Sequence, residues 1–169
     1  MPSLKPATEN DFATIEKLAR VIWDGHYTPI IGEEQVNYML KKMYSPEAIL
    51  EQTAKGQKFY LVVNPETNSG QAENKETGFI SISSTDNKNY FLHKFYILQE
   101  KQNAGLGTKI FKQVFTNLYK PESIQLTVNR QNYKSVNFYF KLGFKIEKVA
   151  DFDIGNGYFM NDYVLSLPL

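Results

Sequence analysis

The chain has 169 residues, a formal net charge of +1 and no cysteine. That length suits a single domain over residues 1–169, and the balanced charge argues against a nucleic-acid partner. The lack of cysteine excludes disulfides, thiolate metal sites and a cysteine nucleophile, and no metal is expected. With neither a signal peptide nor an apolar run of membrane-spanning length, we expect a soluble cytoplasmic protein without a membrane partner.

The first part of the chain predicts a short strand and then three helices. Ser3 to Lys5 is the expected strand, and Thr8 followed by Asp11 resembles a capping signal for the first helix. A connection from Trp23 to Gly32 leads to the second helix. Ser45-Pro46 predicts the start of the third helix, with serine at the N-cap and proline in the first turn.

The sequence from Lys58 to Leu98 predicts three strands. Lys58 to Val63 and Gly78 to Ser84 are expected to pair as a hairpin. The polar stretch between them, Asn64 to Thr77, predicts a long, mobile surface loop. Tyr90 to Leu98 is rich in aromatic and β-branched residues, which favours a third strand.

The most informative segment is Gln102-Asn103-Ala104-Gly105-Leu106-Gly107, which follows the third strand. It precedes a helix whose apolar residues recur at three- and four-residue spacing: Ile110, Phe111, Val114, Phe115 and Leu118. The first N–H groups of a helix lack partners, the helix dipole is positive there, and glycine lets a ligand approach closely. The segment therefore predicts a site for a pyrophosphate.

Two common phosphate-binding loops do not match this segment. A Walker loop needs lysine directly after the last glycine, whereas Gly107-Thr108-Lys109 has the order reversed. A dinucleotide fingerprint needs a third small residue at the position where Ile110 stands.

A second motif follows in the last third of the chain. Ser123 to Val128 predicts a strand, Asn132 an N-cap, and Gly143 the C-terminal cap of a short helix. Two final strands are expected, one ending at Phe152 and one from Tyr158 to Leu167. The predicted order is β-α-α-α-β-β-β-α-β-α-β-β, which suits an α/β (α+β) fold with one mixed sheet.

On these residues the chain resembles the GNAT superfamily of acyl-CoA-dependent N-acetyltransferases. The resemblance is carried by Ile97 to Gly107, by Asn132 with Phe138-Tyr139, and by Gly143-Phe144. It implies the GNAT acyl-CoA N-acyltransferase fold, with a mixed, mostly antiparallel sheet and helices on both faces. It also implies acetyl-CoA as the co-substrate and an amine as the acceptor.

The resemblance places acetyl-CoA on the third strand and the glycine segment. Backbone groups of Phe95 and Ile97 would pair with pantetheine amides, like an added strand. A backbone N–H near Ile97 or Leu98, released by a strand bulge, would polarise the thioester carbonyl. The expected cofactor-binding residues are Phe95, Tyr96, Ile97, Gln102, Asn103, Ala104, Gly105, Leu106, Gly107, Thr108 and Asn132.

The resemblance gives two candidates for catalytic residues. Tyr139 stands at the family's tyrosine position and would donate a hydrogen bond to the departing thiolate; the alternative is a tyrosine that only packs under its helix. Many relatives place a glutamate base at positions held here by His93 and Thr127. His93 has a suitable intrinsic pKa, so it is one candidate base, against the alternative of a structural histidine. The other candidates are Asp24, His26, Glu33, Glu34 and a water network.

The resemblance places the acceptor site at the first two helices, their connection and the last hairpin, which contributes Asp153, Tyr158, Asn161 and Asp162. Trp23, Asp24, His26 and Tyr27 combine aromatic rings with a carboxylate, which suits a cationic amine. In this respect the chain is similar to the bacterial spermidine/spermine acetyltransferase branch. The alternative is that Trp23 and Tyr27 fix the end of the helix in the core.

The leading functional hypothesis is an acetyl-CoA-dependent N-acetyltransferase that acts on the primary amine of a small molecule, such as a polyamine. One alternative is acetylation of protein N-termini or lysines. Another is a non-catalytic acyl-CoA-binding module that senses the cofactor or contacts a partner. The oligomeric state is open, with a homodimer as one alternative.

Overall fold

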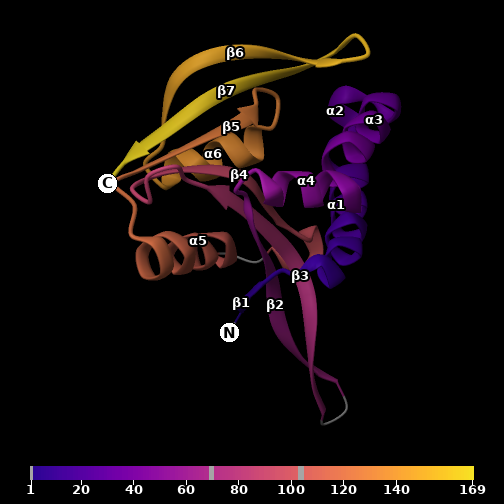
Figure 1. The fold of residues 1–169 in the computed structure, drawn as a ribbon, viewed down its shortest axis with the longest axis vertical. Coiled ribbons are helices and arrows are strands. Elements are labelled where there is room, and N and C mark those ends of the chain that lie inside the picture. Colours follow the sequence, from indigo (N-terminus) through magenta and orange to yellow (C-terminus); the bar gives the residue numbers. More distant parts are fainter. Residues whose placement is uncertain (1, 69–70, 103–104) are drawn as a thin grey trace. The chain divides into compact units, whose positions relative to one another are not determined.

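The computed structural model describes residues 2–68, 71–102 and 105–169. Within these ranges the strands form one seven-stranded sheet in the order β1-β2-β3-β4-β5-β7-β6 (Figure 1). The strands are β1 (Ser3–Pro6), β2 (Lys58–Asn68), β3 (Gln71–Ser83), β4 (Asn89–Ile97), β5 (Ser123–Asn129), β6 (Lys145–Gly155) and β7 (Tyr158–Pro168). The β4–β5 pair is parallel, whereas β1–β2, β2–β3, β5–β7 and β6–β7 are antiparallel.

The longer helices occur at the predicted places between these strands. They are η1 (Glu9–Asp11), α1 (Phe12–His26), α2 (Thr28–Ile31), α3 (Glu33–Tyr44), α4 (Pro46–Ala54), η2 (Gln99–Lys101), α5 (Leu106–Lys112), η3 (Gln113–Tyr119) and α6 (Tyr133–Lys141). The α+β class with a mixed sheet is therefore confirmed. None of the helices in the described ranges is both long enough and apolar enough to cross a membrane.

The chain forms two compact units. The first comprises the chain up to Ile82 together with Lys94–Ile110, and the second comprises Ser83–His93 with Phe111–Leu169. Strand β4 and helix α5 therefore each contribute residues to both units. The description of 1–169 as a single domain stays a prediction.

The first unit has a core between strands and the helices α1 to α4. Ile15, Val36, Ile49, Leu61 and Ile80 are all fully buried there. These residues come from both helices and strands, so burial of their apolar side chains is the main force that holds the unit together.

Local signals fixed the helix starts of this unit. The Asp11 carboxylate accepts a hydrogen bond from the Thr8 backbone N–H at 2.9 Å and one from Lys5 Nζ at 2.8 Å. The Ser45 hydroxyl accepts one from the Ala48 backbone N–H at 3.2 Å, and Pro46 begins α4. Both predicted caps are therefore confirmed.

The expected loop from Asn64 to Thr77 is wrong. The hairpin strands β2 and β3 continue to pair through this stretch, from Asn64↔Lys75 to Asn68↔Gln71. Because β1 pairs with β2 only as far as Val63, the rest of β2 is an edge, where Pro65 is tolerated. The sequence from Asn64 to Thr77 shows no apolar alternation, which is why it predicted a loop.

Two further expectations about helices need correction. The connection from Trp23 to Gly32 is largely helical, because α1 runs to His26 and α2 follows. The apolar stripe expected through Leu118 is also interrupted, since α5 continues as the π-helix η3. A π-helix has more residues per turn than an α-helix, so Leu118 leaves the buried face and is 52% exposed.

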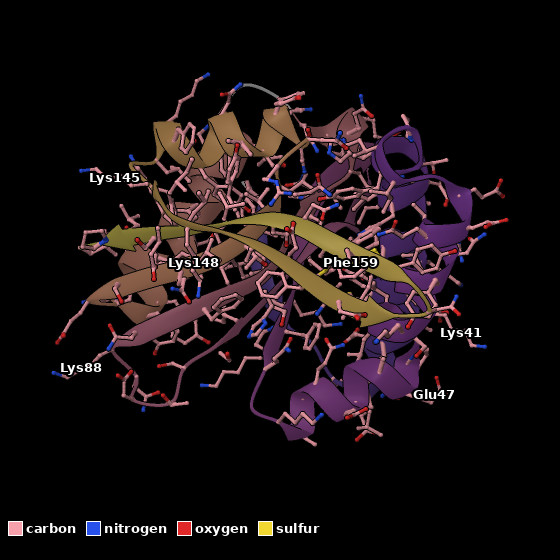
Figure 2. All side chains as sticks on the ribbon, turned by 90° about the horizontal axis from the view of Figure 1, so that it is seen from above. Lys41, Glu47, Lys88, Lys145, Lys148 and Phe159 are labelled. Carbon is pink, nitrogen blue, oxygen red and sulfur yellow. The ribbon has the colours of Figure 1, made fainter. Side chains whose placement is uncertain are left out.

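The second unit is built on β5, β7 and β6. Ile124, Leu126 and Leu165 are almost completely buried in its core. Its edge strand β6 forms a long hairpin with β7, and Figure 2 labels Lys145 and Lys148 on β6. The predicted N-cap of α6 is confirmed, because Asn132 Oδ1 accepts a hydrogen bond from the Ser135 N–H at 3.2 Å.

Candidate active site

The predicted pyrophosphate segment forms the turn into α5. Gly105 has φ +87°, in the left-handed region that favours glycine, and a Cβ built there would meet no atom within 4 Å. The Gly105 carbonyl accepts the hydrogen bond of the Lys109 N–H at 3.0 Å. The N–H groups of Leu106 to Thr108 thus belong to the first turn of the helix, whose N–H groups have no partner within the helix itself. Asn103 and Ala104 lie outside the described residues.

The side chain of Gln102 fixes the start of this turn to the end of β4. Its Nε2 donates a hydrogen bond to the Ile97 carbonyl at 2.7 Å, and its backbone N–H donates to the Gln99 carbonyl at 3.1 Å. Gln102 therefore connects the strand with the glycine turn, so its side chain holds the loop in place.

Strand β3 approaches the end of β4 very closely. A Cβ on Gly78 would clash with the carbonyl oxygen of Tyr96 and would lie 3.1 Å from Ile97 Cα. Only glycine permits this approach. The register of β2 and β3 also shifts here, so that Thr77 is an extra residue on β3. Gly78 was predicted only as the start of a strand, although a glycine inside a strand pattern is a signal for such contact.

The Leu98 backbone N–H is not available to a ligand. It donates a hydrogen bond of 2.8 Å to the carbonyl of Thr77, the extra residue of the bulge. Leu98 was one of the two residues expected to polarise the thioester carbonyl, and that alternative is wrong. The expected bulge on β4 would have freed the Leu98 N–H. The observed bulge lies on β3 instead, and the carbonyl of its extra residue, Thr77, accepts that N–H.

The parallel register of β4 and β5 runs from Asn89↔Ser123 to Leu92↔Leu126. Phe95, Tyr96 and Ile97 follow this stretch on β4. They are the residues whose backbone was expected to bind pantetheine, and they lead directly to Gln102 and the glycine turn.

The aromatic residues expected to bind the acceptor are buried in the first unit. Trp23 and Tyr27 lie one helical turn apart with ring centroids 4.4 Å apart, and they are 4% and 7% exposed. Trp23 also packs on Tyr44 and Tyr96, at 5.4 and 6.2 Å between centroids. The hydroxyls of Tyr44 and Tyr96 share a hydrogen bond, and burial raises the pKa of Tyr44 well above its ordinary value.

The other two expected acceptor residues lie outside this aromatic cluster. Asp24 is exposed and pairs with Arg20 Nη1 at 3.4 Å. The half-buried ring of His26 packs edge-on against Tyr27 at 4.9 Å between centroids. Trp23 and Tyr27 are thus buried, whereas the Asp24 side chain is at the surface. The binding roles of all four residues stay predictions.

A buried lysine adjoins the same aromatic cluster, and sequence reasoning missed it. Lys94 is 7% exposed, and its Nζ lies 5.3 Å from the ring centroids of both Tyr44 and Phe59. The side chain of Gln52 accepts a hydrogen bond from Nζ through its Oε1 at 2.6 Å. Burial lowers the pKa of Lys94 to about 7.

His93 takes a different place from Lys94, because neighbouring residues of a strand point to opposite faces. Its Nε2 lies 2.7 Å from the Ser83 hydroxyl, and its ring packs on Phe91 at 4.7 Å between centroids. These contacts fit the alternative of a structural histidine. A role for His93 as the base gains no support from this placement.

Tyr139 and Asn132 lie in the second unit. Tyr139 is 8% exposed and packs on Phe138 and Phe144, at 5.3 and 5.5 Å between centroids. Asn132 is also buried, and its side-chain oxygen caps α6. Capping and packing are thus established for these residues, while their contacts with the cofactor stay predictions.

A buried carboxylate lies close to the end of β5. Asp162 on β7 is 5% exposed and accepts a hydrogen bond from the Thr127 side chain. Burial raises the pKa of Asp162 to about 6, against the opposing effects of the Thr127 hydrogen bond and the Arg130 charge. Sequence reasoning placed Asp162 in the last hairpin but had no means to see its burial.

No group of three or more His, Asp or Glu side chains gathers in the described part of the chain in a way that could hold a metal ion. Among the described residues, the first unit offers the backbone of the glycine turn and Lys94 as polar groups, and the second unit offers Tyr139 and Asp162. Transfer from an acyl-CoA to an amine requires a site for the diphosphate of the donor, a group that accepts a proton and a hydrogen-bond donor for the leaving thiolate.

Known proteins resemble this chain in sequence and in structure. A family model for the acetyltransferase (GNAT) domain matches residues 27–155. Spermidine N(1)-acetyltransferase of Thermoplasma acidophilum is 27% identical over 139 residues, which are 81% of this chain and 84% of that protein.

Two crystal structures share the fold. PaiA N-acetyltransferase from Thermoplasma acidophilum in complex with coenzyme A has a TM-score of 0.75 and 22% identity, over 100% of this chain and 99% of that chain. Spermidine N-acetyltransferase from Vibrio cholerae in complex with CoA and spermine has a TM-score of 0.63 and 18% identity, over 99% and 95%. Because the family model covers most of the chain, the protein belongs to the GNAT family and is an acetyl-CoA-dependent N-acetyltransferase.

Proposed function

We propose that this enzyme transfers the acetyl group of acetyl-CoA to a primary amine of a small polyamine. The support is twofold: the relative from Thermoplasma acidophilum is a spermidine N(1)-acetyltransferase, and the chain aligns with it over most of its length. The residues predicted for the acceptor do not add to this support, because Trp23 and Tyr27 are buried and Asp24 pairs with Arg20.

The donor is held by the end of β4 and the glycine turn. The observation that carries this assignment is Gly105, which takes a left-handed backbone conformation before α5 and has open space at its Cβ position. Amides of Leu106 to Thr108 bind the pyrophosphate, since an anion is favoured at a helix N-terminus. Backbone groups of Phe95 and Ile97 pair with the pantetheine amides.

Tyr139 stabilises the leaving group. A phenol donates a hydrogen bond to the thiolate that develops on the CoA sulfur, and such a bond to a charged group is strong. Full proton transfer is not required, because a phenol with a pKa of about 10 is a weaker acid than a thiol near 8.5. The backbone N–H of Ile97 is the remaining candidate for polarising the thioester carbonyl.

The acceptor amine must lose a proton before it attacks. An alkyl ammonium has a pKa of about 10.4, so deprotonation at neutral pH costs roughly 4 to 5 kcal/mol. A group that accepts this proton is therefore part of the proposed function. The cytoplasmic location and the homodimer stay predictions from the sequence.

The test is a panel of amines with acetyl-CoA, followed by release of the free CoA thiol. We expect spermidine and spermine to give a kcat/KM at least about tenfold above that for N-terminal or lysine peptides, because the similar protein from Thermoplasma acidophilum is a spermidine N(1)-acetyltransferase. A preference for peptides would instead support protein acetylation. Binding of acetyl-CoA without turnover of any amine would support the non-catalytic module.

A further inference from the structure

The end of β5 carries a buried acid that the proposed function has not used. We propose that Asp162 is the catalytic residue that takes the proton from the acceptor amine. This inference rests on the proposed function, because it supplies the proton acceptor that transfer to an amine requires.

Strand pairing determines the place of Asp162. On β7 it lies opposite Asn129 of β5 and opposite Ala150 of β6. Thr127 lies two residues before Asn129, so it is the diagonal neighbour of Asp162 on the same face of the sheet. The hydrogen bond from Thr127 to Asp162 follows from this register.

The burial of Asp162 distinguishes it from the other acids of the same hairpin. Glu147, Asp151 and Asp153 on β6 are exposed. Exposure is common on β7 as well, where even the apolar side chain of Phe159, labelled in Figure 2, is 47% exposed. A buried carboxylate without a full ion pair is costly, and such groups concentrate at functional sites. Asp162 is the one acid of the hairpin, within the described residues, that the fold removes from water.

Arg130 is the cation whose charge acts on Asp162, but its guanidinium is paired with another acid. Arg130 Nη2 forms an ion pair with Asp151 Oδ1 at 2.9 Å, and the Arg130 backbone N–H donates to the Asn161 carbonyl at 3.0 Å. Arg130 Nη1 is buried and has no hydrogen-bond partner in the part of the chain that the structure describes. The Asp162 carboxylate therefore keeps acceptor capacity for a proton.

The chemistry balances with Asp162 as the acceptor. The substrate ammonium gives one proton to the Asp162 carboxylate, and the neutral nitrogen attacks the thioester carbon. The C–N bond forms and the C–S bond breaks. The second nitrogen proton ends on the CoA sulfur as a thiol, and Asp162 releases the first proton to solvent.

The pKa of Asp162, about 6, suits this role. The acid is ionised at neutral pH, yet it is more basic than an ordinary aspartate. Below this pKa the carboxyl is protonated and cannot accept, so kcat/KM falls as the pH drops below about 6. The groups that act on it are Thr127 and Arg130, which lower the pKa, and Asp151, which raises it.

The experiment measures kcat/KM for spermidine from pH 5 to 9 for the wild type and three variants. Asp162→Asn is expected to lower kcat about 100-fold or more, with the acetyl-CoA dissociation constant within twofold. Its remaining activity lacks the fall below about pH 6. Glu147→Gln, an exposed carboxylate of the same hairpin that is hydrogen-bonded to Gln125, is the matched control and retains the wild-type profile.

Thr127→Val keeps the test decisive if Asp162→Asn does not fold. The hydroxyl lowers the pKa of Asp162, so its removal moves the acid limb upward by about one pH unit. The inference is overturned if that limb does not move, if Asp162→Asn keeps kcat within threefold, or if only acetyl-CoA binding weakens.

These results separate the two proposals. A wild-type enzyme that acetylates no amine of the panel ends the proposed function and this inference with it. An active wild type with an unaltered Asp162→Asn variant ends this inference alone.

Discussion

The two units build their functional regions from different atoms. In the first unit the donor region depends on the main chain: a left-handed Gly105, the Ile97 carbonyl held by Gln102, and a bulge at Thr77. In the second unit the candidate chemistry depends on side chains, above all Asp162 and Tyr139. A main-chain site tolerates most substitutions that keep its conformation, whereas a side-chain site is lost by a single isosteric change.

The buried titratable groups of the two units also differ in what their protonation affects. Lys94 is enclosed by two rings and Gln52, so its proton affects the stability of the first unit. Asp162 lies in a polar cluster at the end of β5, so its proton is available to chemistry. Both groups titrate near neutral pH, but we expect only Asp162 to shape the pH dependence of turnover.

Lys94→Met has the largest expected effect and tests this contrast. The folded pKa of Lys94 is about 7, whereas the unfolded value is 10.5. Between these pH values the unfolded chain binds more protons, so wild-type stability rises with pH by about 1.4 kcal/mol per unit. Below pH 7 both states are protonated, and the folded state carries the full cost of a buried charge.

Urea unfolding of both proteins from pH 6 to 9 measures this difference. The stability of the wild type relative to Lys94→Met is expected to rise above pH 7, while kcat keeps its acid limb. Lys55→Met is the control, since the Lys55 side chain is 71% exposed and pairs with Glu51 on the surface of α4. A pH-independent difference for Lys94→Met would contradict the assignment of a depressed pKa.

Tyr139→Phe tests whether the second unit contributes to turnover through a side-chain hydroxyl. Loss of a hydrogen bond to a charged leaving group costs about 1.5 to 3 kcal/mol, so kcat should fall roughly 10- to 100-fold. The dissociation constant of acetyl-CoA should change little. Tyr133→Phe, on the exposed side of the same helix, should leave both constants unchanged. Equal kcat in the two variants would remove the role of Tyr139.

Gly105→Val tests whether acetyl-CoA binding depends on the backbone conformation of the glycine turn. A β-branched residue at φ +87° strains the turn by about 1 to 3 kcal/mol, which weakens acetyl-CoA binding roughly 5- to 100-fold. Gly56→Val introduces the same kind of strain at φ +97° after α4, and it serves as the control. If both variants bind acetyl-CoA equally well by calorimetry, the turn does not hold the donor.

Gln102→Ala has the smallest expected effect. The side chain only positions the turn, and a neutral hydrogen bond contributes about 0.5 to 1.5 kcal/mol. The KM for acetyl-CoA should therefore rise roughly two- to tenfold with kcat unchanged. Gln99→Ala, an exposed neighbour in η2, should not alter KM. A fall in kcat without a change in KM would point to a different role for Gln102.

Local signals predicted much of the fold. The caps at Ser45 and Asn132 and the glycine at position 105 have the geometry that their residue types favour. Each of these depends on atoms within four residues in the chain, so the sequence alone carries the information. The order of strands and helices followed from the same signals.

Features that depend on distant residues could not be predicted. The hairpin from Asn64 to Thr77 is stabilised by pairing and shows no apolar alternation. The burial of Lys94 depends on Gln52, and that of Asp162 on the register with β5. Leu98 lost its expected role because the carbonyl of Thr77 takes its N–H. None of these contacts leaves a pattern in the residues themselves.

The most direct test of the donor site is to follow the backbone amide signals by NMR while coenzyme A is added. We predict the largest shifts for Gly105 to Thr108 and for Phe95 to Ile97, the segments that bind the pyrophosphate and pantetheine. Unchanged signals in both segments, with shifts confined to other parts of the chain at saturating coenzyme A, would contradict the account.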